Sequence, residues 1–75
     1  MTGKNMTYEE FKSTFPVGSK FKIMAGRRKE VVDFLDDEKL AVTKYRCNSS
    51  GSGYRYEVMG AEDIAFWSKH MEKLK

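Results

Sequence analysis

Cysteine, histidine and proline each occur only once in this 75-residue chain, and no apolar run approaches the roughly 20 residues of a membrane-spanning helix. With Cys47 alone, the chain can form no intramolecular disulfide and can supply only one thiolate to a zinc site. The first residues also lack the apolar core of a secretory signal peptide. We therefore expect a protein of the reducing cytoplasm that neither enters nor crosses a membrane.

Residues for catalysis are equally scarce. His70 is the only candidate general base, and in a segment with a helical pattern a solvated histidine is the simpler interpretation. Cys47 would need a neighbouring base to act as a nucleophile, so we interpret it as a strand residue. Residues 36–38 are consecutive acids without calcium-loop spacing, and the glycine-serine segment 48–53 lacks the lysine of a phosphate-binding P-loop. The sequence thus predicts no enzymatic activity, no metal site and no small-molecule cofactor.

The composition is typical of a small globular domain. It is 40% hydrophobic and 13% aromatic, which is too apolar for a disordered segment, and a chain of this length builds only a small core. We expect one domain over residues 1–75, with a tail at 1–5, a β-rich core at about 17–60 and a helix at about 61–74.

A first helix is predicted to begin after Thr7 and to end before Pro16. Thr7 and Glu10 have the spacing of a capping box, in which each residue bonds the backbone of the other. Met6 and Phe11 have the spacing of a hydrophobic staple across the same helix start. Proline disfavours helical backbone in the residue before it, so the helix is short.

Four segments alternate apolar and polar residues with the period of two that is typical of half-buried strands. In these segments we expect Phe21 and Ile23 to face inward, and Tyr56 to face inward together with Val58. The predicted strands are residues 20–24, 30–35, 40–47 and 54–59.

The second of these strands leaves two alternatives open. Either Val32 and Phe34 or Val31 and Leu35 face the core, because apolar residues occur on both sides of the segment. We expect both faces of this strand to be partly covered.

A second helix is predicted over residues 61–73. Its apolar residues Ile64, Trp67, Met71 and Leu74 recur at helical spacing, and Trp67 is expected to anchor the helix on the sheet. The element order is then αββββα, with short turns that imply an antiparallel meander. The expected fold is mainly β with flanking helices, an α+β chain in which a small four-stranded barrel or curled sheet is covered by the second helix.

Three segments, FPVGSKFK from Phe15, EVVDFLDDEKLAVTKY from Glu30 and GYRYEVMGAEDI from Gly53, follow one another in a rhythm that resembles SH3-like and KOW-type small barrels. Such barrels occur in many small bacteriophage and bacterial proteins. The resemblance covers roughly residues 15–64 and lacks the KOW glycine, the acidic specificity loop and the proline pocket of those families. It implies the fold alone, and the host cytoplasm as the location if the chain is encoded by a phage.

Charge and aromatic residues point to binding. The net charge of +3 is unevenly spread, because residues 1–29 carry seven basic and two acidic side chains whereas residues 30–43 carry one and five. The hairpin at 44–56, KYRCNSSGSGYRY, adds arginines and tyrosines on either side of a glycine-serine tip. Ten residues form the predicted binding surface: Lys20, Lys22, Arg27, Arg28, Lys29, Lys44, Tyr45, Arg46, Tyr54 and Arg55.

Nucleic acid is the first expected partner of this surface. Lysine and arginine would contact phosphates, and bases would stack on exposed tyrosines. Tyr45 and Tyr54 could equally belong to the core, an alternative that the sequence leaves open. The second expected partner is a host or cellular protein, bound by a regulator or inhibitor of phage type that uses the acidic edge from Glu30 to Glu38.

Overall fold

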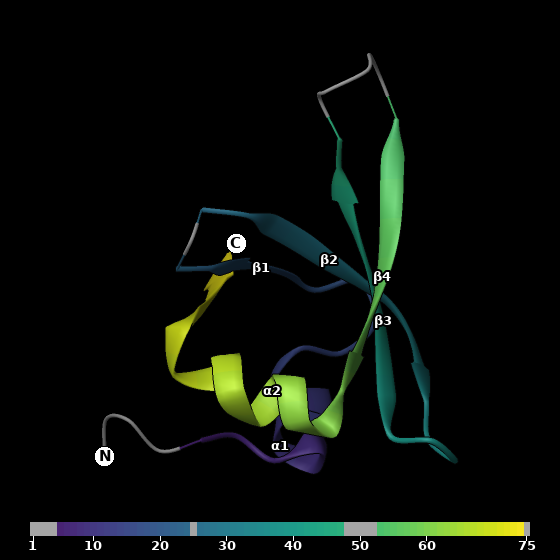
Figure 1. Cartoon of the computed structure of the whole chain (residues 1–75), viewed down its shortest axis with the longest axis vertical. Coiled ribbons are helices and arrows are strands. Elements are labelled where there is room, and N and C mark those ends of the chain that lie inside the picture. The colour runs from purple at the N-terminus through teal and green to yellow at the C-terminus, as the bar shows by residue number, and fades with distance from the viewer. Residues whose placement is uncertain (1–4, 25, 48–52, 75) are drawn as a thin grey trace.

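The computed structural model describes residues 5–24, 26–47 and 53–74 of the chain. Five strands form one antiparallel sheet in the order β4-β3-β2-β1-β5, and two short helices lie against it (Figure 1). The four predicted strands are all present, with bounds within two residues of those expected. The elements are α1 (Tyr8–Thr14), β1 (Lys20–Ile23), β2 (Arg28–Leu35), β3 (Leu40–Arg46), β4 (Tyr54–Gly60), α2 (Ala61–Trp67), the 3₁₀ turn η1 (Ser68–His70) and β5 (Met71–Leu74).

The predicted capping box at the start of α1 is confirmed. The Thr7 hydroxyl accepts a hydrogen bond from the backbone N–H of Glu10 at 3.1 Å, and the Glu10 carboxylate accepts one from the N–H of Thr7 at 3.0 Å. Two backbone donors at the helix N-terminus are thereby satisfied. The helix ends at Thr14, ahead of Pro16 as predicted.

The core is an aromatic cluster between the two helices and one face of the sheet, here called the inner face. Phe11 of α1 is fully buried, with its ring centroid 4.9 Å from that of Phe15 and 5.7 Å from that of Phe21. Phe21 and Ile23 face inward as predicted. Among the described residues, the buried core consists of Tyr8, Phe11, Phe15, Phe21, Ile23, Val31, Ala41, Met59 and Ile64, with Trp67 among the half-buried residues packed against it.

A β-bulge in β2 decides the question that the sequence left open there. The register of β2 against β3 shifts between Val31 and Asp33. Because the bulge adds one residue to β2, Val31 and Phe34 both face inward although they are three positions apart. Neither of the two alternatives that we expected is therefore correct as a pair.

The prediction that Tyr56 faces the core is wrong. Its side chain is 65% exposed, and Val58 on the same face is 56% exposed. The pairing of β4 with β3 places Met59 beside the buried Ala41, so the odd-numbered residues of β4 face inward and the even-numbered ones face outward. We call this second face of the sheet the outer face.

The predicted helix over 61–73 is also wrong beyond Trp67. The Ser68 hydroxyl donates to the backbone carbonyl of Ala65 at 3.0 Å and accepts from the N–H of Met6 at 2.7 Å, and the chain then turns into β5. Met71 still packs on the core, but as a strand residue opposite Ile23 of β1. The sheet therefore has five strands instead of four, and the barrel is not closed, because β4 and β5 stand at opposite edges.

Candidate nucleic-acid interface

The β3–β4 hairpin projects beyond the rest of the sheet as an arm. The last residue pair between β2 and β3 is Glu30 with Lys44, whereas β3 and β4 remain paired as far as Arg46 with Tyr54. In Figure 1 the arm runs upward while β2 diverges toward the turn that joins it to β1. Five of the ten predicted binding residues line the space between this turn and the arm.

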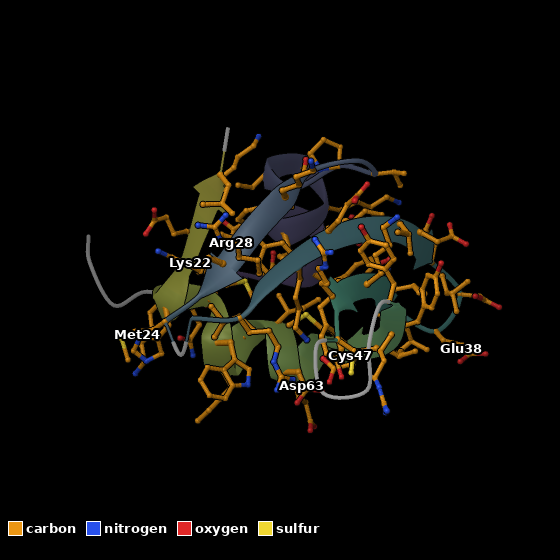
Figure 2. The ribbon with its side chains drawn as sticks, turned by 90° about the horizontal axis from the view of Figure 1, so that it is seen from above. Lys22, Met24, Arg28, Glu38, Cys47 and Asp63 are labelled. Carbon is orange, nitrogen blue, oxygen red and sulfur yellow. The ribbon has the colours of Figure 1, made fainter. Side chains whose placement is uncertain are left out.

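All four arginines of the chain line one open hollow of about 580 Å³ in this space. Two come from the end of the β1–β2 turn and the start of β2, and two come from the arm. Figure 2 shows Arg28 and Cys47 from above this end of the molecule. We call this the arginine hollow, and its lining residues are Gly26, Arg27, Arg28, Tyr45, Arg46, Cys47 and Arg55.

The charges in the arginine hollow are largely uncompensated. Arg27 pairs with the Glu57 carboxylate at 3.4 Å and lies over the Tyr45 ring at 4.8 Å. Arg28, Arg46 and Arg55 are exposed, and no carboxylate lies within ion-pair distance of them in the part of the chain that the structure describes. Three guanidinium groups therefore present their donors to solvent, in the planar arrangement that binds phosphate bidentately.

A second hollow of about 550 Å³ adjoins the first one and shares Arg28, Tyr45 and Arg46 with it. Its charges are mixed, because Lys44 lies 3.8 Å from the Glu30 carboxylate. The Lys44 ammonium also stands 5.0 Å from the ring centre of Tyr54, which is 60% exposed. This outer hollow is lined by Lys20, Arg28, Lys29, Glu30, Lys44, Tyr45, Arg46, Tyr54 and Leu74.

Lys29 is not a surface residue, although the sequence placed it in the binding surface. It is only 6% exposed and forms an ion pair with Glu57 on the inner face. Burial lowers the pKa of its ammonium, and the neighbouring Arg27 lowers it further. Lys29 therefore lines the outer hollow with its charge neutralised within the fold by Glu57.

Lys22 lines neither hollow. It stands opposite Glu72 of β5, and the two charged groups are 3.8 Å apart. This pair does not follow from the predicted elements, in which residue 72 belongs to a helix. The other nine predicted residues line one or both hollows, and Tyr45 is half-buried under Arg27 whereas Tyr54 is exposed.

Three exposed or lining residues of this region are not among the ten predicted binding residues. Cys47 lines the arginine hollow, and Tyr56 and Val58 extend the exposed outer face of β4 beyond Tyr54. A signal for the last two was present, because Met59 is also apolar and occupies the alternate face of the same strand. Alternation alone could not choose between the two faces.

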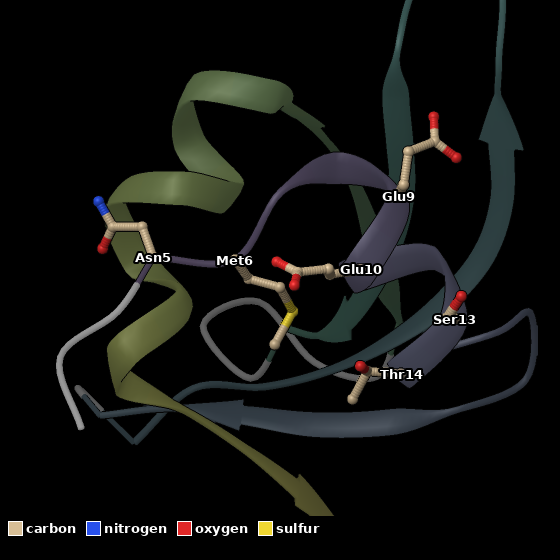
Figure 3. Close-up of a pocket in the computed structure, with 6 residues that line it drawn as sticks. All are labelled: Asn5, Met6, Glu9, Glu10, Ser13 and Thr14. Carbon is tan, nitrogen blue, oxygen red and sulfur yellow. The ribbon is translucent and has the colours of Figure 1, made fainter. Parts of the chain in front are cut away.

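A further hollow lies beside α1, and two of its lining residues make contacts that stabilise the fold (Figure 3). Glu10 on its wall belongs to the capping box, and Glu9 pairs with Lys39 at 3.1 Å.

Within residues 5–24, 26–47 and 53–74 no group of three potential metal ligands occurs, and no helix of these segments is long and apolar enough to cross a membrane. Comparison of the chain with protein-family models, curated proteins and solved structures gives no match.

Proposed function

We propose that this protein is a small non-enzymatic module that binds nucleic acid through the arginine hollow. The observation that carries the proposal is the gathering of all four arginines, which come from separate segments of the chain, around one open surface. None of the lysines that the structure describes lines this hollow. A cluster of like charges opposes folding, so a polyanion that neutralises it would bind favourably.

The outer hollow supports a second part of the contact. Tyr54 offers an exposed ring at its rim, with the Lys44 ammonium beside it. A base stacked on this ring would leave its phosphate near Arg46, which lines both hollows. This arrangement of an aromatic ring beside basic groups is typical of proteins that bind single strands.

The proposal is tested by titrating fluorescent single- and double-stranded oligonucleotides at about 50 and 200 mM salt. Arg28→Ala combined with Arg46→Ala removes two phosphate contacts, so we expect affinity to fall and the slope of log affinity against log salt to decrease by about 2. The matched control combines Lys22→Ala with Lys69→Ala, which removes the same charge outside the arginine hollow. No binding by the unmodified protein at low salt, or equal losses in the two double variants, would refute the proposal.

A protein-binding module is the second candidate function, of the type that regulates or inhibits a host enzyme. The exposed side chains of Tyr54, Tyr56 and Val58 favour it, because they form an apolar row on an edge strand. The acidic edge is a weaker argument than the sequence suggested, since Glu30 pairs with Lys44 and Asp36 with Lys12. Affinity capture from nuclease-treated lysate separates the two functions, because a partner bridged by nucleic acid would be lost.

We also propose kinship with SH3-like small barrels. The antiparallel meander of β1 to β4 and the return of β5 to the side of β1 are compatible with it. We also place the protein in the cytoplasm, or in the host cytoplasm if a phage encodes it, because its single cysteine suits a reducing compartment.

A further inference from the structure

The strand β4 stands at an edge of the sheet, and the only charged residues in it are Arg55 and Glu57, which carry opposite charges. It contains neither lysine nor proline, and its register against β3 is continuous over seven residue pairs from Gly60 to Tyr54. The other edge strand, β5, is only four residues long. A long, regular edge without lysine, proline or a bulge is a template for another strand.

The direction of the backbone groups in β4 follows from one hydrogen bond. The N–H of Cys47 donates to the carbonyl of Gly53 at 3.0 Å, so this pair is hydrogen-bonded. In an antiparallel ladder every second pair is hydrogen-bonded, and therefore Arg55 and Glu57 also direct their backbone groups toward β3. The N–H and C=O groups of Tyr54, Tyr56 and Val58 then point to the unpaired edge.

Charge selects one register for a second copy of the same strand. Pairing centred on Tyr56 places Arg55 opposite Glu57 of the second copy, and this pairing occurs twice by symmetry. A centre one residue later would place two copies of Glu57 opposite each other, and one residue earlier two copies of Arg55. Like charges directly opposite are unfavourable, whereas the first register places opposite charges together at both positions. Glu57 already pairs with Lys29 and Arg27, and its partly exposed carboxylate would be shared with Arg55 of the second copy.

The outer face agrees with the same register. Tyr56 would stand opposite Tyr56 of the second copy, and Tyr54 opposite Val58. Such aromatic and β-branched cross-strand pairs stabilise sheets, and here they would cover side chains that are more than half exposed in the single chain. Each even-numbered residue of one copy would lie opposite an even-numbered residue of the other. The N–H and C=O groups at the unpaired edge of each strand would therefore hydrogen-bond to those of the other.

We propose that β4 pairs antiparallel with β4 of a second copy of this chain, about a twofold axis at Tyr56, to form one continuous sheet. The contact is confined to one strand, so the dimer is reversible and depends on concentration. It does not require nucleic acid. Arg55 and Tyr54 belong to both proposed contacts, but Arg28 and Arg46, which the binding test replaces, take no part in the strand pairing. Failure of the dimer would consequently leave the proposed function standing, and the reverse also holds.

Cysteine cross-linking tests the register. In a Cys47→Ser background, Tyr56→Cys places two thiols on residues whose Cα atoms would be about 5.5 Å apart, within disulfide range. Val58→Cys is the matched control, because residue 58 would lie opposite residue 54 and the two introduced thiols would be roughly 13 Å apart along the strands. We expect disulfide-linked dimers from the first variant and few from the second, and a mixed disulfide when Tyr54→Cys and Val58→Cys proteins are combined. Equal cross-linking of the two single variants would overturn the proposal.

Sedimentation of the nuclease-treated protein provides a second measurement that needs no cysteine. The mass should rise from 8.7 kDa toward twice that value as the concentration increases. Arg55→Glu, which places like charges opposite each other at both positions, should keep the protein monomeric, whereas the control Lys69→Glu, an equal change of charge away from β4, should not. A mass of 8.7 kDa at all concentrations up to about 1 mM would refute the dimer, because pairing weaker than that falls below the affinity range of specific complexes.

Discussion

Lys29 of β2 and Glu57 of β4 form an ion pair across the inner face, although β3 lies between their two strands. The Lys29 side chain is buried, whereas that of Glu57 is partly exposed and also accepts from Arg27. The pair joins the base of the projecting arm to β2, the strand that begins at the arginine hollow. Replacing Glu57 would leave the buried Lys29 ammonium without a partner, whereas replacing Lys29 would leave a Glu57 carboxylate that is partly exposed.

Glu57→Gln should destabilise the protein by on the order of 3 kcal/mol, because it leaves the buried ammonium of Lys29 without its carboxylate. Lys29→Met should cost far less, since it fills a similar volume and leaves Glu57 in contact with Arg27 and solvent. Urea unfolding of the two variants measures the difference. Equal losses in both would show that the ion pair contributes as a unit and that the burial of Lys29 is not decisive.

The hydroxyl of Tyr8 should make stability sensitive to alkali. Burial, and to a smaller extent the hydrogen bond that the Tyr8 hydroxyl donates to the Asp36 carboxylate at 2.9 Å, raise the pKa of Tyr8 from 10.0 to about 12. Because the folded pKa exceeds the unfolded one, this contribution is fully present below pH 10 and is lost as pH rises from about 10 to 12. In Tyr8→Phe the free energy of unfolding should fall less over this interval than in the unmodified protein. A parallel decline in both proteins would contradict the assignment.

Local chemistry explains which parts of the fold the sequence predicted. The capping box at Thr7 and the alternation that buries Phe21 and Ile23 depend on neighbouring residues, and both are confirmed. The fifth strand could not be foreseen, because the spacing from Ile64 to Met71 fits a helix while the pairing of Met71 with Ile23 joins distant parts of the chain.

In the candidate site, too, local features were predictable from the sequence and contacts between distant segments were not. The sequence identified the arginines and tyrosines of the arm, but it could not tell which cations the fold neutralises. Lys29 and Lys22 are each paired with an acid from another strand, Glu57 and Glu72. Such pairs follow from register and from the bulge in β2, which alternation within one segment does not reveal.

The fifth strand predicts a pattern of amide exchange. Only every second N–H of an edge strand points to its neighbour, so protection along Met71–Leu74 should alternate from residue to residue. A continued helix would instead protect consecutive amides. Hydrogen exchange followed by NMR distinguishes the two patterns, and the amides of α2 serve as the helical reference within the same protein.

Tyr54 should contribute to the binding of single strands but not of duplexes, because only unpaired bases can stack on its exposed ring. Loss of one stacked base costs about 1 to 3 kcal/mol, so Tyr54→Ala should weaken single-strand binding by roughly 5- to 150-fold. Tyr54→Phe keeps the ring and should bind nearly as well as the unmodified protein, which controls for the loss of the hydroxyl. Binding is measured at a protein concentration at which sedimentation gives the monomer mass of 8.7 kDa, so the change reports on the nucleic acid alone. If Tyr54→Ala weakens binding to duplex and single strand equally, the ring acts by holding Lys44 in place, since the Lys44 ammonium lies 5.0 Å from its centre.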